Sequence, residues 1–142
     1  MTLALQATCV AMSGRGILIE GAPGSGKSTL ALSLIDRGAA LVGDDSLMLE
    51  AVSGSLFAMP HPETRGLIEV RQVGIVSLPV VDRLPLALAM VLVPDPARLP
   101  ADPLPARELL TVALPQIALR AHDAANPLRV EQALALHGLA KR

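Results

Sequence analysis

Aromatic residues are almost absent from this chain of 142 residues, which has no tryptophan, no tyrosine and a single phenylalanine, Phe57. Without aromatic rings on which bases can stack, the sequence argues against single-stranded nucleic-acid binding. Basic residues are in no excess either, because the formal net charge is −1, whereas a nucleic-acid footprint shows a basic surplus. We therefore expect no nucleic-acid partner.

Cysteine and long apolar runs are scarce as well. The single cysteine, Cys9, excludes an intrachain disulfide framework and lies in an apolar run that favours a buried position. The longest apolar run, at 84–93, is about half as long as a membrane-spanning helix. The N-terminus lacks the basic segment typical of a secretory signal. These features predict one domain over residues 1–142, without membrane insertion and with a cytoplasmic location.

Glycine is present in the pattern of a phosphate-binding loop. Residues 21–28 read GAPGSGKS and fit G-x-x-x-x-G-K-[ST] at every required position; we call them the phosphate loop. Glycines let successive backbone N–H groups turn toward an anion, and the following helix adds its positive N-terminal end. In this pattern Lys27 reaches the β- and γ-phosphates, and the Ser28 hydroxyl can ligate Mg²⁺. The candidate nucleotide-binding residues are Gly21, Ala22, Pro23, Gly24, Ser25, Gly26, Lys27 and Ser28.

The segments around the loop predict an α/β fold, a P-loop domain with a mixed central sheet. A short apolar strand is expected at 15–20, and a helix at 28–37 with Gly38 at its end. Asn126-Pro127 predicts the start of a last helix, with Asn126 as its N-cap, and the proline-rich stretch 94–105 predicts a loop. Further strands are expected at 2–12, 39–42, 47–52, 55–59, 67–70, 74–78, 86–93, 109–114 and 116–119.

Two adjacent carboxylates, Asp44 and Asp45, follow the strand expected at 39–42. Strands of such a sheet end at the ligand crevice, and adjacent side chains of an extended segment point to opposite sides. One carboxylate can then face Mg²⁺ or its waters, while the other orients and deprotonates an incoming hydroxyl. The alternative is an acidic turn whose carboxylates accept local N–H groups.

Four segments, 21–28, 32–39, 41–45 and 67–75, together resemble the catalytic domain of HPr kinase/phosphorylase. The resemblance covers most of the chain, is strong up to Ile75 and is weaker beyond it. It implies an ATP- and Mg²⁺-dependent kinase that phosphorylates a serine of the phosphocarrier protein HPr and can reverse the reaction by phosphorolysis. It also implies a homo-oligomer, since family members assemble as hexamers. The family's separate N-terminal domain has no counterpart in this sequence, so the chain resembles a short form.

The resemblance also gives roles to single residues. Lys27 contacts the phosphates, and Asp45 matches the acid/base that accepts the serine proton and returns one in phosphorolysis. Ser28 and Glu69 fall at the Mg²⁺ position, where Asp44 is a further candidate ligand. The late catalytic arginine of the family is matched by Arg98, in the proline-rich loop.

Glu69 and Arg71 fall in a family signature, Glu-x-Arg-Gly-x-Gly-Ile, for which the alternative is a solvated pair on one strand face. Two departures from the family stand out: Gln6 replaces a histidine, and Gln72 replaces the first signature glycine. A late loop at 120–126 also lacks the family's glycine and second arginine. These departures count most against phosphorolysis and next against HPr as the substrate, for which a related carrier protein is the alternative. Gln6 and Gln72 also leave open a nucleotide-binding regulator without turnover, and a small-molecule P-loop kinase is the other alternative.

Overall fold

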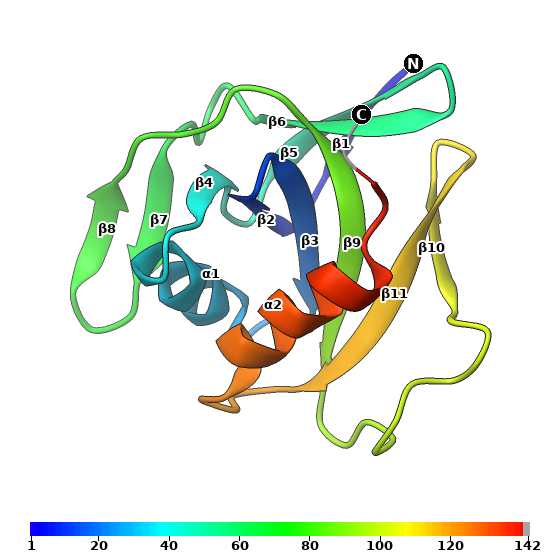
Figure 1. The fold of residues 1–142 in the computed structure, drawn as a ribbon. Coiled ribbons are helices and arrows are strands. Elements are labelled where there is room, and N and C mark those ends of the chain that lie inside the picture. The colour runs from blue at the N-terminus through cyan, green and yellow to red at the C-terminus, as the bar shows by residue number, and fades with distance from the viewer. Residues whose placement is uncertain (141–142) are drawn as a thin grey trace.

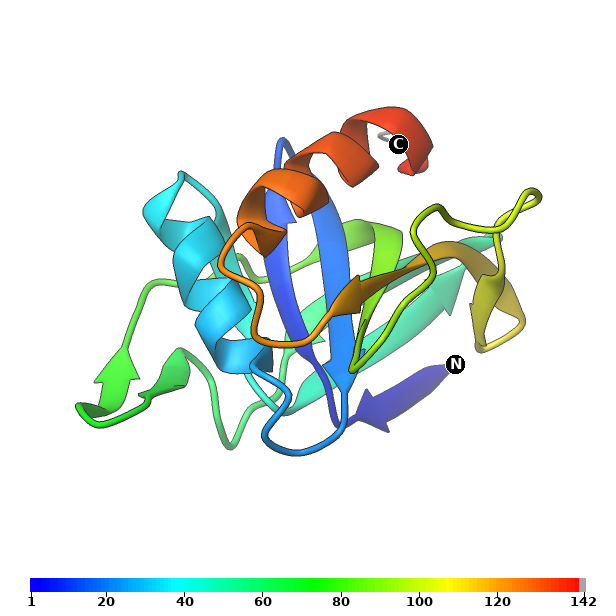
Figure 2. The same ribbon diagram turned by 90° about the horizontal axis from the view of Figure 1, so that it is seen from below.

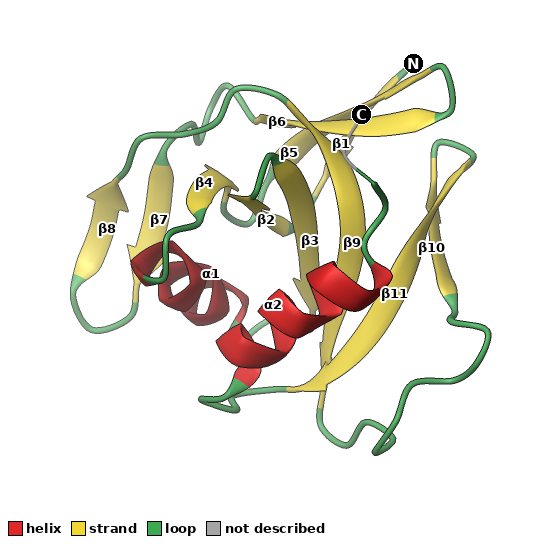
Figure 3. Cartoon of the chain, viewed as in Figure 1, coloured by secondary structure: helices red, strands yellow, loops and turns green. Residues whose placement is uncertain are grey.

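The computed structural model describes residues 1–140, which form a curled sheet covered on one face by two helices (Figures 1 and 3). The helices are α1 (Lys27–Asp36) and α2 (Asn126–His137). The strands are β1 (Thr2–Leu5), β2 (Thr8–Met12), β3 (Arg15–Gly21), β4 (Ala40–Gly43), β5 (Leu47–Val52), β6 (Ser55–Pro60), β7 (Leu67–Val70), β8 (Gly74–Ser77), β9 (Leu84–Val93), β10 (Ala106–Leu109) and β11 (Val112–Arg120). The predicted α/β class with a mixed sheet is confirmed.

The long strand β9 organises the main sheet. β3 and β11 pair with it in parallel, and β6 pairs antiparallel with its first residues. The path of the sheet is β1-β5-β6-β9-β3-β2-β4, with β10 antiparallel to β11. β2 is antiparallel to both β3 and β4, so β3, β4, β9 and β11 all run the same way. The loops that follow these four strands therefore leave from one edge of the sheet.

Two apolar clusters fill the two faces of the central strands. Side chains alternate along β3, so that Ile17 and Ile19 face the helices, whereas Leu18 faces the opposite, concave side of the sheet. β9 behaves in the same way, with Met90 on the helix side and Ala89 on the other. Burial of both faces explains why these strands appear in the sequence as continuous apolar runs.

The end of α1 follows the sequence prediction. Gly38 has φ 109°, and its N–H donates to the Ile35 carbonyl at 3.0 Å. The Ala39 N–H donates to the Leu34 carbonyl at 3.0 Å, which completes the Schellman pattern of a helix C-terminus. Cys9 is fully buried, and this burial raises the pKa of its thiol, as expected of an unreactive core residue.

Three sequence expectations about local structure were wrong. The strand expected at 2–12 is divided into β1 and β2, and the strand expected at 109–114 is interrupted by a turn at Leu110 and Thr111. Both turn residues have positive φ, a conformation usually marked by glycine or asparagine and therefore not visible in this sequence. Asn126 is the first residue of α2 and makes no cap; its buried amide donates to the Arg120 carbonyl instead.

Two other findings concern segments beside the main sheet, and a third concerns the helices. β7 and β8 form a separate two-stranded sheet beside α1 (Figure 1). The 94–105 stretch is a loop, as predicted, between β9 and β10. Within residues 1–140, neither helix has the length and apolar character needed to cross a membrane.

Candidate functional site

The phosphate loop connects the end of β3 to the start of α1. Gly24 and Gly26 have φ of 80° and 97°, which residues with a Cβ rarely adopt. A Cβ at Gly21 would lie only 2.5 Å from the Ser25 hydroxyl oxygen, so the loop is also too tight there for a side chain. No side chain caps α1, which leaves the N–H groups of its first turn for a ligand.

Two side chains of the loop are arranged for an anion. Lys27 Nζ donates to the carbonyls of Gly21 at 2.9 Å and Ala22 at 3.3 Å, so the ammonium group lies over the loop. The Ser25 hydroxyl is buried and has no hydrogen-bond partner within residues 1–140. Buried polar groups are seldom left unpaired. The loop thus combines a positive charge with donors that have little to bind in the protein itself.

Asp44 holds the loop to the rest of the site. Its side chain is buried and accepts the Ser28 hydroxyl, with Oγ 2.7 Å from Oδ1 and 2.9 Å from Oδ2. Thr8 Oγ1 donates to Oδ1 at 3.0 Å, and the Glu69 N–H donates to Oδ2 at 3.3 Å. One carboxylate therefore joins α1, β2 and β7 to the end of β4. Thr8 was missed in the sequence because a small residue in an apolar run looks like part of the core.

Asp45 has the opposite environment. It is exposed, and its N–H is 3.3 Å from Thr8 Oγ1, which can accept it. The two side chains point to different sides, as the sequence predicts, but the cause differs from the prediction. Asp45 has φ 63°, so a left-handed turn, and not the alternation of a strand, separates the two side chains.

A cleft of about 350 Å³ lies between the phosphate loop, the end of β4 and the β7–β8 hairpin; we call it the phosphate cleft. The structure brings most of the predicted site residues together in it. The lining also includes His122, which the sequence analysis did not place at the site. The lining residues are Pro23, Gly24, Gly26, Lys27, Ser28, Thr29, Asp44, Asp45, Glu69, Arg71 and His122.

The signature pair lies on this cleft and not on a remote surface. Glu69 belongs to β7 and Arg71 follows it, and both side chains are exposed at the cleft. Gln72, which replaces the signature glycine, has φ 70° in the turn to β8. This is a backbone conformation that a glycine adopts easily. Gln6, between β1 and β2, is exposed and is not among the lining residues.

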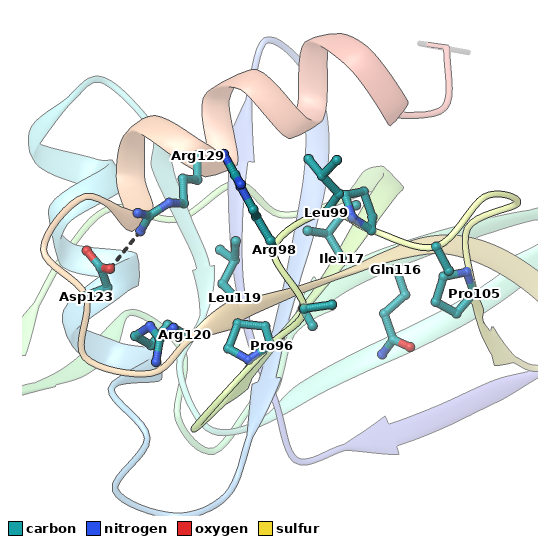
Figure 4. Close-up of a pocket in the computed structure, with 14 residues that line it drawn as sticks. Pro96, Arg98, Leu99, Pro105, Gln116, Ile117, Leu119, Arg120, Asp123 and Arg129 are labelled. Carbon is teal, nitrogen blue, oxygen red and sulfur yellow. Dashed lines mark ion pairs between the residues drawn. The ribbon is translucent and has the colours of Figure 1, made fainter.

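Arg98 lies elsewhere. It lines a second cleft of about 370 Å³ between the 94–105 loop, β11 and α2, which we call the arginine cleft (Figure 4). Arg120 and Arg129 line it too, and the two clefts have no lining residue in common. Arg129 pairs with Asp123 at 3.0 Å, and Arg120 lies 3.6 Å from Asp95. The Ala125 N–H and Arg129 hold the pKa of Asp123 below its usual value.

Comparisons with known proteins agree on one relationship. A model of the family described as HPr Serine kinase C-terminal domain matches residues 2–81. HPr kinase/phosphorylase of Clostridium tetani (strain Massachusetts / E88) is 43% identical over 75 residues, which are 53% of this chain and 25% of the relative. For the Clostridium beijerinckii protein of the same name, the identity is 43% over 74 residues, covering 52% and 24%.

The structural comparison extends beyond the matched segment. The Hpr(Ser) kinase/phosphatase from Coxiella burnetii superimposes with a TM-score of 0.82 and 29% identity, covering 95% of this chain and 95% of that one. The similarity of fold thus includes β9 to α2, which lie beyond the residues that the family model matches. The chain spans about a quarter of the length of those curated relatives.

Proposed function

The chain belongs to the family of HPr serine kinase C-terminal domains, and we propose that it transfers the γ-phosphoryl group of ATP to a serine hydroxyl of HPr. The observation that carries this proposal is the hydrogen bond between the Ser28 hydroxyl and Asp44 at 2.7 Å, inside a cleft that also contains Asp45. A phosphate loop alone indicates binding. A loop joined to one carboxylate, with a second carboxylate exposed beside it, supplies parts that recur in phosphoryl-transfer sites.

The residues present fit ATP and Mg²⁺. The glycine-lined loop and the unpaired Ser25 hydroxyl suit a phosphate chain. Mg²⁺ is usually held by one or two carboxylates together with substrate phosphates, and Ser28, Asp44 and Glu69 are the residues that would hold it here. When bound, Mg²⁺ would neutralise charge that develops on the phosphate oxygens.

Each step of the transfer can be assigned to a residue of this chain. Lys27 and the loop N–H groups hold the β- and γ-phosphates and offset their charge. Asp45 accepts the proton of the serine hydroxyl as its oxygen bonds to the γ-phosphorus. The bond from that phosphorus to the β,γ-bridging oxygen breaks, and ADP leaves with the electron pair. In phosphorolysis Asp45 would return a proton to the departing serine oxygen.

Two further expectations belong to this proposal. We propose a homo-oligomer, with the hexamer as the form the resemblance implies, in the cytoplasm. Exposed apolar side chains on the β7–β8 hairpin support an interface there, since Val73 is 76% and Ile75 is 64% exposed. A catalytic role for Arg98 stays a prediction. Arg98 lines the arginine cleft and not the phosphate cleft.

The direct test is incubation of the chain with γ-labelled ATP, Mg²⁺ and purified HPr, followed by mapping of the labelled residue. We expect label on a serine of HPr, and at least about 100-fold slower labelling when Asp45→Asn replaces the wild-type chain. Tight ATP binding without label on HPr would contradict the proposed activity and would identify a nucleotide-binding regulator. Label on a small molecule in place of HPr would identify a small-molecule kinase.

A further inference from the structure

The loop between β11 and α2 brings a histidine against the phosphate loop. His122 lines the phosphate cleft together with Lys27 and Asp45. A Cβ at Gly26 would lie 3.2 Å from His122 Nδ1, so the imidazole packs directly against the last glycine of the loop. The His122 side chain is exposed, which leaves its ring open to a ligand seated in the loop.

The topology explains how so distant a residue reaches the loop. β3 and β11 both run parallel to β9, so the segments that follow them leave from the same edge of the sheet. Ligands of open α/β sheets bind at this edge. Figure 2 shows the orange segment between β11 and α2 running beside the first turn of α1.

The residues on both sides of His122 are fixed. The Asn126 amide donates to the Arg120 carbonyl at 2.7 Å. Asp123 accepts the Ala125 N–H at 2.9 Å and pairs with Arg129 at 3.0 Å (Figure 4). Because its neighbours are fixed, the loop that carries His122 needs little rearrangement when a ligand binds.

The backbone of His122 is itself unusual. Its φ is 63°, in the left-handed region, where histidine is more frequent than most residues other than glycine. Such outliers persist where the surrounding structure holds them, and they cluster at ligand clamps and active sites. Here the conformation places an imidazole ring beside Gly26. A glycine at position 122 would adopt the same backbone but has no ring.

We propose that His122 supplies an N–H donor to the phosphate held by the loop. Gln6 is exposed and outside the lining of the phosphate cleft, whereas His122 is inside it. The inference rests on the proposed function for the identity of the phosphate, which is the ATP phosphate bound by Lys27. His122 is therefore a binding residue of the site, placed on its β11 side.

The test uses two variants that suit the left-handed backbone. His122→Gly removes the ring and relaxes the backbone, and His122→Asn tolerates the same φ and retains an N–H donor. We expect His122→Gly to raise the Kd for pyrophosphate and for Mg·ATP about 10-fold, the effect of one hydrogen bond to a charged group. We expect His122→Asn to stay within about threefold of wild type. His137→Asn, outside the phosphate cleft, is the matched control and should leave Kd unchanged.

Two readouts separate this role from a structural one. Thermal unfolding of His122→Gly should occur at or above the wild-type temperature, so that weaker binding is not a sign of unfolding. In ¹⁵N-edited NMR spectra, pyrophosphate should shift the His122 ring resonances and leave those of His137 in place. A wild-type Kd for His122→Gly, or an unmoved His122 resonance, would overturn the inference.

Failure of the proposed function would be seen separately. If the wild-type chain binds pyrophosphate through His122 but does not label HPr, the role of His122 stands and the proposed kinase activity is contradicted. If the wild type and His122→Gly label HPr at equal rates and bind with equal Kd, the proposed kinase activity stands and the role of His122 is contradicted.

Discussion

The phosphate cleft and the arginine cleft are similar in size and lie near each other, yet their charged side chains have different partners. In the arginine cleft, Arg129 is paired with Asp123 and Arg120 lies near Asp95. In the phosphate cleft, Lys27 bonds only to backbone carbonyls, and Ser25 has no partner within the described residues. Positive charge alone therefore does not identify the phosphate site. What distinguishes it is the combination of Lys27, held over backbone carbonyls, with a glycine-rich loop and the uncapped start of α1, whose N–H groups can bind a phosphate.

The comparison also concerns carboxylates. Asp123 is bound by the cations and N–H groups of its own cleft, which lower its pKa. Asp44 is likewise engaged, but with hydroxyl and N–H donors of three other elements, and Asp45 remains exposed beside it. The phosphate cleft thus has two exposed carboxylates, Asp45 and Glu69, whereas the carboxylate that lines the arginine cleft, Asp123, is paired with Arg129.

The largest effect is expected from the free carboxylate. Asp45→Asn removes the proposed proton acceptor and should lower the rate of phosphoryl transfer by about 10²- to 10⁴-fold. ATP affinity should change little, because Asp45 is not proposed to hold the phosphates. Single-turnover kinetics with HPr measures the rate, and calorimetry measures the affinity. Asp95→Asn, beside the arginine cleft, is the control, and full activity of Asp45→Asn would contradict the assignment of the base.

The next effect separates the two clefts by their cations. Lys27→Ala should raise the Kd for Mg·ATP by about 100-fold or more, because it removes a charge-assisted contact to phosphate. Arg98→Ala should leave that Kd unchanged, since Arg98 lines only the arginine cleft. Calorimetric titration of both variants gives the contrast. Equal losses of affinity would mean that the two clefts form one binding site, and a lower transfer rate for Arg98→Ala at unchanged Kd would support its catalytic assignment.

The sequence was most informative where the site is local in the chain. The phosphate loop, the end of α1 at Gly38 and the Asp44-Asp45 pair are short motifs whose conformations depend on neighbouring residues. Glu69 and Arg71 were found through resemblance, because nothing in their spacing alone points to the loop. The α/β fold followed from the pattern of apolar runs.

The sequence was least informative where distant strands meet. His122 reaches the site because β11 pairs in parallel with β9, and no local pattern indicates that pairing. Thr8 supports Asp44 because β2 lies beside β4, and a buried threonine cannot be distinguished from core by composition. Two left-handed residues, Leu110 and Thr111, hid a turn inside an apparent strand. In each case long-range packing decided the structure.

A smaller effect tests the support behind the phosphate cleft. Thr8→Val keeps the shape of the side chain but removes the hydroxyl that donates to Asp44 and lies 3.3 Å from the Asp45 N–H. Loss of this donor to a buried carboxylate should reduce the free energy of unfolding by about 1–3 kcal/mol, as measured by urea denaturation. Thr2→Val, on the exposed strand β1, is the matched control and should be close to neutral. Equal stabilities of the two variants would mean that Asp44 does not depend on Thr8.

The smallest effect belongs to the arginine cleft and depends on pH. The Ala125 N–H and Arg129 lower the pKa of Asp123 in the folded protein, so its charge stabilises the fold above the usual aspartate pKa. That contribution is lost as the pH falls through the lowered value. Asp123→Asn should therefore unfold at a slightly lower temperature than wild type at pH 7, and the difference should shrink in acid. Thermal scans across this range measure it, with Asp102→Asn in the 94–105 loop as the control. A difference that is constant with pH would show that the Asp123 charge does not hold the His122 loop, and the contrast between structural and available carboxylates would then fail.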